Sequence, residues 1–267
     1  MNISIFSYSF HRTLAAGKQD IFKFITDCQE LGISNLELWS GHFDDGSGQP
    51  KNYPPQDSAY IQQVKQALSD AGASLGCIGA DAAHIYDEDP AVTAANRERA
   101  YQWIDIAAEL GSAQIRIDSG PRAEEWTEEV FAKVVAGYQD VIARAQEKGV
   151  QIIIENHWGP SKHPEHLVKL LKAVDGLGFL FDTNNWAEGK REQGWEMCAK
   201  YTNALHIKTF SFDEAGNDPS VDLRKALHLV RDTGYDGMWG IESTPTDGDE
   251  YTAVKKTIAL LERILSE

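Results

Sequence analysis

Residues 128–155 read EEVFAKVVAGYQDVIARAQEKGVQIIIE. Apolar residues recur at helical spacing as far as Lys148, so we predict an amphipathic helix over Glu128–Lys148. Gly149 follows as a residue that commonly ends helices, and the β-branched run within Val150–Glu155 predicts a buried strand. A helix followed at once by a buried strand is typical of repeated βα units on a parallel sheet.

The same alternation runs through the whole chain. Strands are predicted at Ile3–Phe10, Asn35–Trp39, Ser74–Ala80, Ala113–Asp118, Val150–Glu155, Leu177–Phe181, Ala204–Lys208 and Met238–Glu242. Helices are predicted at Asp20–Leu31, Ser58–Ala71, Ala91–Leu110, Glu128–Lys148, His166–Val174, Trp195–Tyr201, Val221–Thr233 and Tyr251–Leu265. This count and the length of 267 residues fit one α/β domain, a (β/α)8 TIM barrel over residues 1–267. A doubly wound open sheet is disfavoured because no GxGxxG follows the first strand.

Composition narrows the class of partner. The formal net charge is −16, from 41 acidic and 25 basic residues, which argues against nucleic acid or an anionic membrane surface as a partner. The three cysteines are scattered and form no CxxC pair, which favours reduced thiols and a cytoplasmic location. We see neither a signal peptide nor an apolar run of the roughly 20 residues that a membrane span needs. A homo-oligomer stays open.

Four successive predicted strands end in residues that can bind a metal. These residues are Glu155, Asp182, His206 and Glu242. Because the carboxyl ends of barrel strands meet in one ring, we expect the four side chains to converge there. Three carboxylates and one imidazole suit one divalent metal ion, with Mn²⁺ or Mg²⁺ favoured and Zn²⁺ or Co²⁺ as alternatives. One such residue alone could be a helix cap or an ion-pair partner, but four in succession favour a metal site.

These segments also carry a family resemblance. The stretches IIIENHWG, FDTNNW, LHIKTF and GIEST, with ISIFSYSF and LELW near the N-terminus, resemble the barrel-end motifs of the xylose isomerase-like superfamily. That group includes sugar isomerases, tagatose/psicose 3-epimerases, inosose dehydratase and endonuclease IV-type repair enzymes. The resemblance spans nearly the whole chain and implies that the same four residues ligate the metal. In the epimerases the two glutamates also act as the acid/base pair, which places that role here on Glu155 and Glu242.

The chemistry of such a site favours one reaction class. A metal on a ketose carbonyl and its neighbouring hydroxyl stabilises the enediolate that forms when the adjacent C–H proton leaves. We therefore expect a metal-dependent isomerase or epimerase acting on a small carbohydrate. The epimerases, however, carry a histidine where this chain has Asn185, and they carry an arginine in the region of Phe212. A lyase of the inosose dehydratase or keto-glycoside type, using the same metal, is the alternative.

Other polar residues at strand ends are candidates for substrate binding. They are Glu37, Arg116, His157, Asn185 and Lys208, with Trp186 as one possible wall for a sugar ring. Each also has a structural explanation. Glu37 and Arg116 could pair across the barrel mouth, Lys208 could neutralise the carboxylates, and His157 could be a hydrogen-bond partner of a ligand. Tryptophan most often packs in a core.

The late loops bear on the substrate. Barrels often bind phosphate in the loops after strands seven and eight, but here those loops are acidic and lack a basic residue. A non-phosphorylated sugar is therefore expected. A repair nuclease would need a basic groove and further metal-binding histidines, which we do not find. A non-enzymatic binding protein on the same barrel is disfavoured by the intact set of four ligands.

Overall fold

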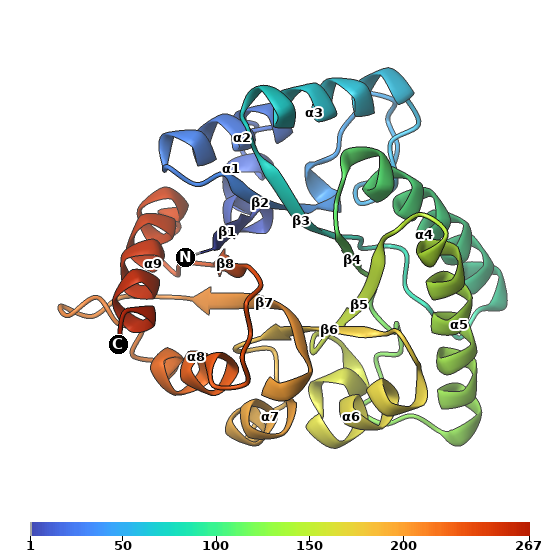
Figure 1. Cartoon of the computed structure of the whole chain (residues 1–267). Coiled ribbons are helices and arrows are strands. Elements are labelled where there is room, and N and C mark those ends of the chain that lie inside the picture. Colours follow the sequence, from blue (N-terminus) through green and yellow to red (C-terminus); the bar gives the residue numbers. More distant parts are fainter. Residues whose placement is uncertain (1) are drawn as a thin grey trace.

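The computed structural model describes residues 2–267 and shows a closed barrel of eight parallel strands. The strands lie in the order in which they occur along the chain, and β1 pairs with β8 to close the barrel. Helices surround the strands as an outer ring (Figure 1). The strands are β1 (Ile3–Phe6), β2 (Asn35–Trp39), β3 (Ser74–Gly79), β4 (Gln114–Arg116), β5 (Gln151–Glu155), β6 (Gly178–Asp182), β7 (Thr202–Thr209) and β8 (Trp239–Ser243). The predicted (β/α)8 TIM barrel is confirmed.

The helices follow the eight predicted positions with small shifts at their ends, except for a short first helix that was not predicted. They are α1 (His11–Ala15), α2 (Ile21–Glu30), α3 (Ser58–Asp70), α4 (Pro90–Leu110), α5 (Glu128–Gln146), α6 (Pro164–Ala173), α7 (Arg191–Cys198), α8 (Leu223–Arg231) and α9 (Glu250–Leu265). Short 3₁₀ turns are η1 (Ser7–Phe10), η2 (Ser40–His42), η3 (Gly159–Lys162) and η4 (Ala199–Tyr201). Among residues 2–267 no helix is both long and apolar enough to cross a membrane.

The first strand is shorter than predicted, because the chain turns at Ser7. The hydroxyl of Ser7 accepts the backbone N–H of Trp39 at 2.8 Å. The hydroxyl of Ser9 donates to the carbonyl of Ile241 and accepts the N–H of Ser243, both at 3.0 Å. Two serine side chains thus replace the backbone ladder to β2 and β8, and η1 and α1 follow the strand.

Strand alternation separates an outer core from the barrel interior. Along β5, Ile152 and Ile154 join the large cluster beneath the helices, whereas Ile153 belongs to a small interior cluster with Cys77, Leu180 and Ala204. Glu155 lies two residues beyond Ile153 and so points to the same interior side. The apolar cluster therefore forms a floor, with the polar ends of the strands above it.

Candidate metal centre and active site

The structure brings Glu155, Asp182, His206 and Glu242 together at the ends of β5, β6, β7 and β8. Each offers one ligand atom, and these atoms lie within 4.8 Å of one another. All four residues are at most 5 % exposed. Asp182 and His206 are register partners across β6 and β7, so the barrel itself sets their proximity.

Asp182 uses one carboxylate oxygen for hydrogen bonds and leaves the other without one. Its Oδ1 accepts the backbone N–H groups of Asn184 and Asn185, both at 2.7 Å. The side chain of Asn156 bonds the backbone N–H and carbonyl of Asp182 at 2.8 and 3.0 Å, which fixes the strand end. Oδ2 is buried and has no hydrogen-bond partner among residues 2–267. An orphaned buried carboxylate oxygen within a ring of donors fits a metal ligand.

The charge environment of Asp182 supports this interpretation. The pKa of Asp182 is raised to about 6, chiefly by burial and also by the nearby Glu242 and Glu155, while Lys208 acts against this rise. Burial also raises the pKa of Glu242, but Lys208 and His206 outweigh it and hold that pKa well below its usual range. The carboxylates therefore need positive charge among them, which a divalent cation can supply.

His206 lies between two carboxylates. Its Nε2 is 3.2 Å from Glu37 Oε2, and its Nδ1 is 3.1 Å from Glu242 Oε2. The second approach is short, but the atoms lack the alignment of a hydrogen bond, and Nδ1 has no hydrogen-bond partner among residues 2–267. Burial alone would lower the pKa of His206, but Glu242 and Glu37 raise it to about 10. In the absence of a metal the His206 imidazole is therefore protonated. Nδ1 is the ring nitrogen that a metal ion could bind.

Lys208 and Asn185 lie among the four candidate ligands. The ammonium of Lys208 is 2.7 Å from Asn185 Oδ1, 3.2 Å from Glu242 Oε1 and 3.4 Å from Asp182 Oδ2. Asn185 also donates from Nδ2 to Glu155 Oε1 at 2.8 Å. Burial lowers the pKa of Lys208, but the surrounding carboxylates outweigh it and raise that pKa. Lys208 thus offsets part of the negative charge of the carboxylates in this structure.

Arg116 organises a second group of acids at the mouth. Its Nη1 donates to Asp81 Oδ1 and to Asp118 Oδ2 at 2.8 Å each, and its Nε is 3.3 Å from Glu155 Oε2. Glu37 pairs instead with His206 and with Ser4. The two residues therefore have separate partners, unlike the ion pair across the mouth that the sequence allowed.

His157 forms a dyad with Asp118. Its Nδ1 lies 3.1 Å from Asp118 Oδ2 and 3.8 Å from Glu155 Oε2, and the His157 side chain is 27 % exposed. Burial lowers the pKa of His157, but Glu155 and Asp118 outweigh it and raise that pKa. Asp118, Glu155 and His157 are also close enough to hold an ion. The Arg116 guanidinium already contacts two of these three, which disfavours a second cation there.

The structure places Trp186 away from the four candidate ligands. It is 6 % exposed and packs against Phe179 and Phe181 at 6.3 and 6.0 Å between ring centroids, in the layer beneath the helices. The sequence analysis named it as a possible wall for a sugar ring, but it joins the apolar cluster of Phe179 and Phe181. It is a packing residue, and we do not retain it as a wall for the substrate.

Asp81 and Asp118 are site residues that sequence reasoning missed. Asp118 closes the fourth predicted strand, and Asp81 directly follows the third. The pattern that singled out the four candidate ligands, a residue able to bind a metal at a strand end, also holds for these two aspartates on the earlier strands.

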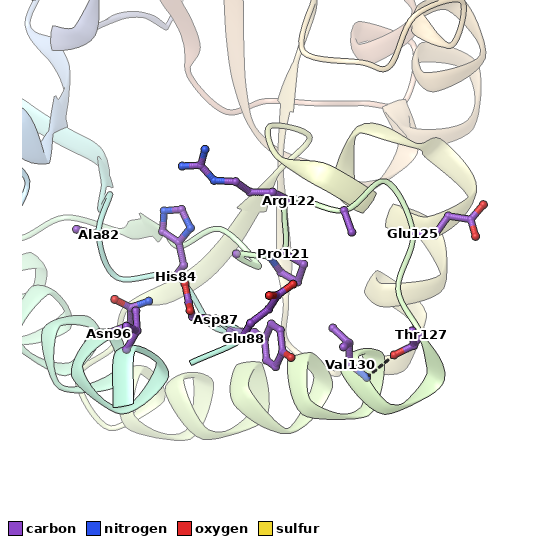
Figure 2. A pocket seen from close by; sticks show the side chains of 14 residues that line it. Ala82, His84, Asp87, Glu88, Asn96, Pro121, Arg122, Glu125, Thr127 and Val130 are labelled. Atoms are coloured by element: carbon purple, nitrogen blue, oxygen red, sulfur yellow. Dashed lines mark hydrogen bonds between the residues drawn. The ribbon is translucent and has the colours of Figure 1, made fainter. Parts of the chain in front are cut away.

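A cavity of about 580 Å³ lies beside the site rather than in it. It is enclosed by the loops after β3 and β4, which the backbone N–H groups of Ile85 and Tyr86 join to Asp118 and Ser119. Figure 2 shows His84 and Arg122 at its border, away from Val130 and Thr127. The Arg122 guanidinium also lies 5.2 Å from the ring of Trp158, the neighbour of His157. Through Arg122 and Trp158 the cavity therefore lies near the dyad.

Several solved structures share this fold. A D-allulose 3-epimerase from Methylomonas sp. aligns over 99 % of this chain and 98 % of its own, with 15 % identity and a TM-score of 0.76. The probable 3-DHS dehydratase of Bacillus anthracis involved in petrobactin synthesis aligns over 97 % and 99 %, with 17 % identity and a TM-score of 0.74. A xylose isomerase-like TIM barrel protein from Mycobacterium smegmatis, in complex with magnesium, aligns over 99 % and 97 %, with 17 % identity and a TM-score of 0.72. At these identities the likeness establishes the fold alone.

Sequence comparison identifies the family. No curated protein matches the chain significantly. The family model described as xylose isomerase-like TIM barrel matches residues 25–264, which is most of the chain. The chain therefore belongs to the xylose isomerase-like TIM barrel family.

Proposed function

We propose that this protein is a divalent-metal-dependent isomerase or epimerase of a non-phosphorylated sugar or keto-sugar. The observation that carries the proposal is the buried ring of Glu155, Asp182, His206 and Glu242, with an orphaned oxygen on Asp182. Three carboxylates favour Mn²⁺ or Mg²⁺ over Zn²⁺ or Co²⁺. A cation bound there would stabilise the negative charge that develops on the substrate oxygens during proton transfer.

Glu155 and Glu242 are the proposed proton carriers. They come from β5 and β8, which are not neighbours in the barrel, so they approach a substrate at the mouth from separate strands. One carboxylate can take the proton from the carbon beside the carbonyl, and the other can return a proton to that carbon. Lys208 and Asn185 contact both sides of the ring and are placed to hold substrate hydroxyl groups.

A lyase on the same centre is the second candidate. It is favoured by the Asp118–His157 dyad, because Asp118 holds Nδ1 of His157 and leaves Nε2 for the partly exposed side. A protonated His157 could donate its Nε2 proton to a leaving hydroxyl or alkoxide on the carbon beyond the one deprotonated. The similarity in fold to a probable dehydratase agrees with this candidate.

The cavity beside the dyad suggests how larger substrates could fit. We propose that it receives whatever substituent the sugar carries beyond the reacting carbons. Its border includes Arg122 and His84 together with the carboxylates Asp87 and Glu88, a mixture that suits a polar group without strong net charge.

The test is turnover of the Mn²⁺-loaded protein with D-fructose, D-allulose, L-ribulose and inososes in D₂O. An isomerase or epimerase gives a product of unchanged formula, usually with deuterium at one carbon. A lyase gives a dehydrated or cleaved product. If no substrate gives either kind of product, that result counts against the proposal. Glu242→Gln should stop turnover, and its metal content must be measured alongside because Glu242 is also a proposed ligand.

A further inference from the structure

Glu37 occupies the barrel interior below the proposed metal centre. It belongs to β2, is 2 % exposed, and reaches His206 on β7, which is not a neighbour of β2 in the barrel. This contact therefore crosses the interior instead of following a strand pair. It is not a consequence of backbone register and needs its own explanation.

The barrel provides a shaped slot for this carboxylate. Ser4 on β1 donates its hydroxyl to Glu37 Oε1 at 2.5 Å. Gly240 on β8 is the register partner of His206, and a Cβ atom there would lie 2.5 Å from the same Oε1. A side chain at position 240 would thus collide with Glu37 and also with the carbonyl oxygen of Leu205. Strands β1, β2 and β8 together fix where the carboxylate sits.

The contact determines which nitrogen of the His206 imidazole points toward the other candidate ligands. A carboxylate only accepts hydrogen bonds, so its bond with Nε2 requires a proton on that nitrogen. Nδ1 then points toward Glu242, and the Phe6 ring stacks on His206 with centroids 4.4 Å apart and limits its rotation. A carboxylate behind a ligating histidine orients the ring and increases its strength as a ligand.

We infer that Glu37 is a positioning residue, which holds His206 through Nε2 so that Nδ1 serves as a metal ligand. This role replaces the substrate contact that the sequence suggested, because Glu37 is enclosed between Ser4 and His206. The inference rests on the proposed metal centre but makes a separate claim, namely that a residue outside the ligand set controls affinity and ligand geometry.

The experiment is calorimetric titration of the metal-stripped protein with Mn²⁺, comparing native protein with Glu37→Gln. Loss of such a partner typically weakens metal binding about 10- to 100-fold, and we expect that range here. Glu250→Gln is the matched control, because Glu250 is also 2 % exposed and accepts the N–H groups of Arg12 and Thr13 outside the ring. It should bind Mn²⁺ like the native protein.

A second readout separates positioning from a general structural role. The visible absorption spectrum of the Co²⁺-loaded protein reports ligand geometry, and it should change in Glu37→Gln but not in Glu250→Gln. If Glu37→Gln does not fold, Ser4→Ala replaces it; that variant loosens the carboxylate and should also weaken Mn²⁺ binding. Native protein that binds no Mn²⁺ refutes the metal centre. If the native protein binds Mn²⁺ and Glu37→Gln shows the same affinity and the same Co²⁺ spectrum, the inference about Glu37 is overturned while the metal centre stands. Where Ser4→Ala replaces that variant, an unchanged Mn²⁺ affinity has the same consequence.

Discussion

The ammonium of Lys208 lies 3.4 Å from Asp182 Oδ2, the carboxylate oxygen that has no hydrogen-bond partner among residues 2–267. Both residues are buried at the end of neighbouring strands. The three ring carboxylates carry more negative charge than one lysine neutralises. Lys208 therefore stabilises the site without a metal, while its positive charge opposes a cation that binds to the same oxygens.

This relationship predicts opposite effects of Lys208→Met on stability and metal binding. Removing one partner of a buried ion pair costs about 3–5 kcal/mol, so we expect the metal-free variant to melt at a lower temperature. Its Mn²⁺ affinity should rise, because one like charge has left the ring. Calorimetry and thermal melts measure both, with Lys225→Met as a control at a lysine paired on the surface with Glu192. Weaker Mn²⁺ binding in the Lys208 variant would show that the ammonium supports the metal instead.

The raised pKa values of His206 and His157 predict a pH dependence of the metal-free protein. Each folded-state pKa lies above the usual value of 6.5, and that of His206 is about 10. The stability that these charged rings contribute is therefore fully present below pH 6.5 and is lost as the pH rises toward 10. Thermal melts should show this fall, and Asp118→Asn should reduce the part that belongs to His157, because Glu155 still raises the pKa of that ring.

Saturating Mn²⁺ should flatten the same profile, because a ligating His206 has no proton to lose at Nδ1. Melting temperatures that fall equally with and without Mn²⁺ would argue against His206 as a ligand. A metal-free protein whose stability does not change between pH 6.5 and 10 would contradict the charge states assigned to both rings.

Filling the cavity of about 580 Å³ beside the site should affect the binding of large substrates selectively. Val130 lines the cavity and Ala132 does not, although both lie on α5. With isomaltulose, a ketose that carries a second ring, Val130→Trp should raise KM about tenfold, or about 1.4 kcal/mol. KM for D-fructose should stay unchanged, as should both values in the control Ala132→Trp. Equal effects on the two sugars would place the second ring elsewhere.

The fold was predictable because its signals are local. Helical periodicity, terminal glycines and β-branched runs repeat along the chain, as residues 128–155 illustrate. The early end of β1 was not, since it depends on hydroxyl bonds from Ser7 and Ser9 to strands far away in the sequence.

The site was predictable only in part, for a related reason. Strand ends converge in any barrel, so the proximity of Glu155 to the three other candidate ligands could be predicted from sequence. Sequence position does not show which way a loop turns, so the packing of Trp186 against Phe181 could not be predicted. A contact across the interior, such as that of Glu37 with His206, depends on side-chain reach that only coordinates provide.

The central claim is that the four strand-end residues bind one divalent ion. Calorimetric titration of the metal-stripped protein with Mn²⁺ tests it most directly, with Asp182→Asn beside the native chain. The asparagine keeps an oxygen for the N–H groups of Asn184 and Asn185 but removes the charge from the orphaned position. We predict about one ion per native chain and at least a 100-fold loss of affinity in the variant, in line with the loss of a charged ligand. No binding to the native protein, or equal binding to both proteins, would contradict the claim.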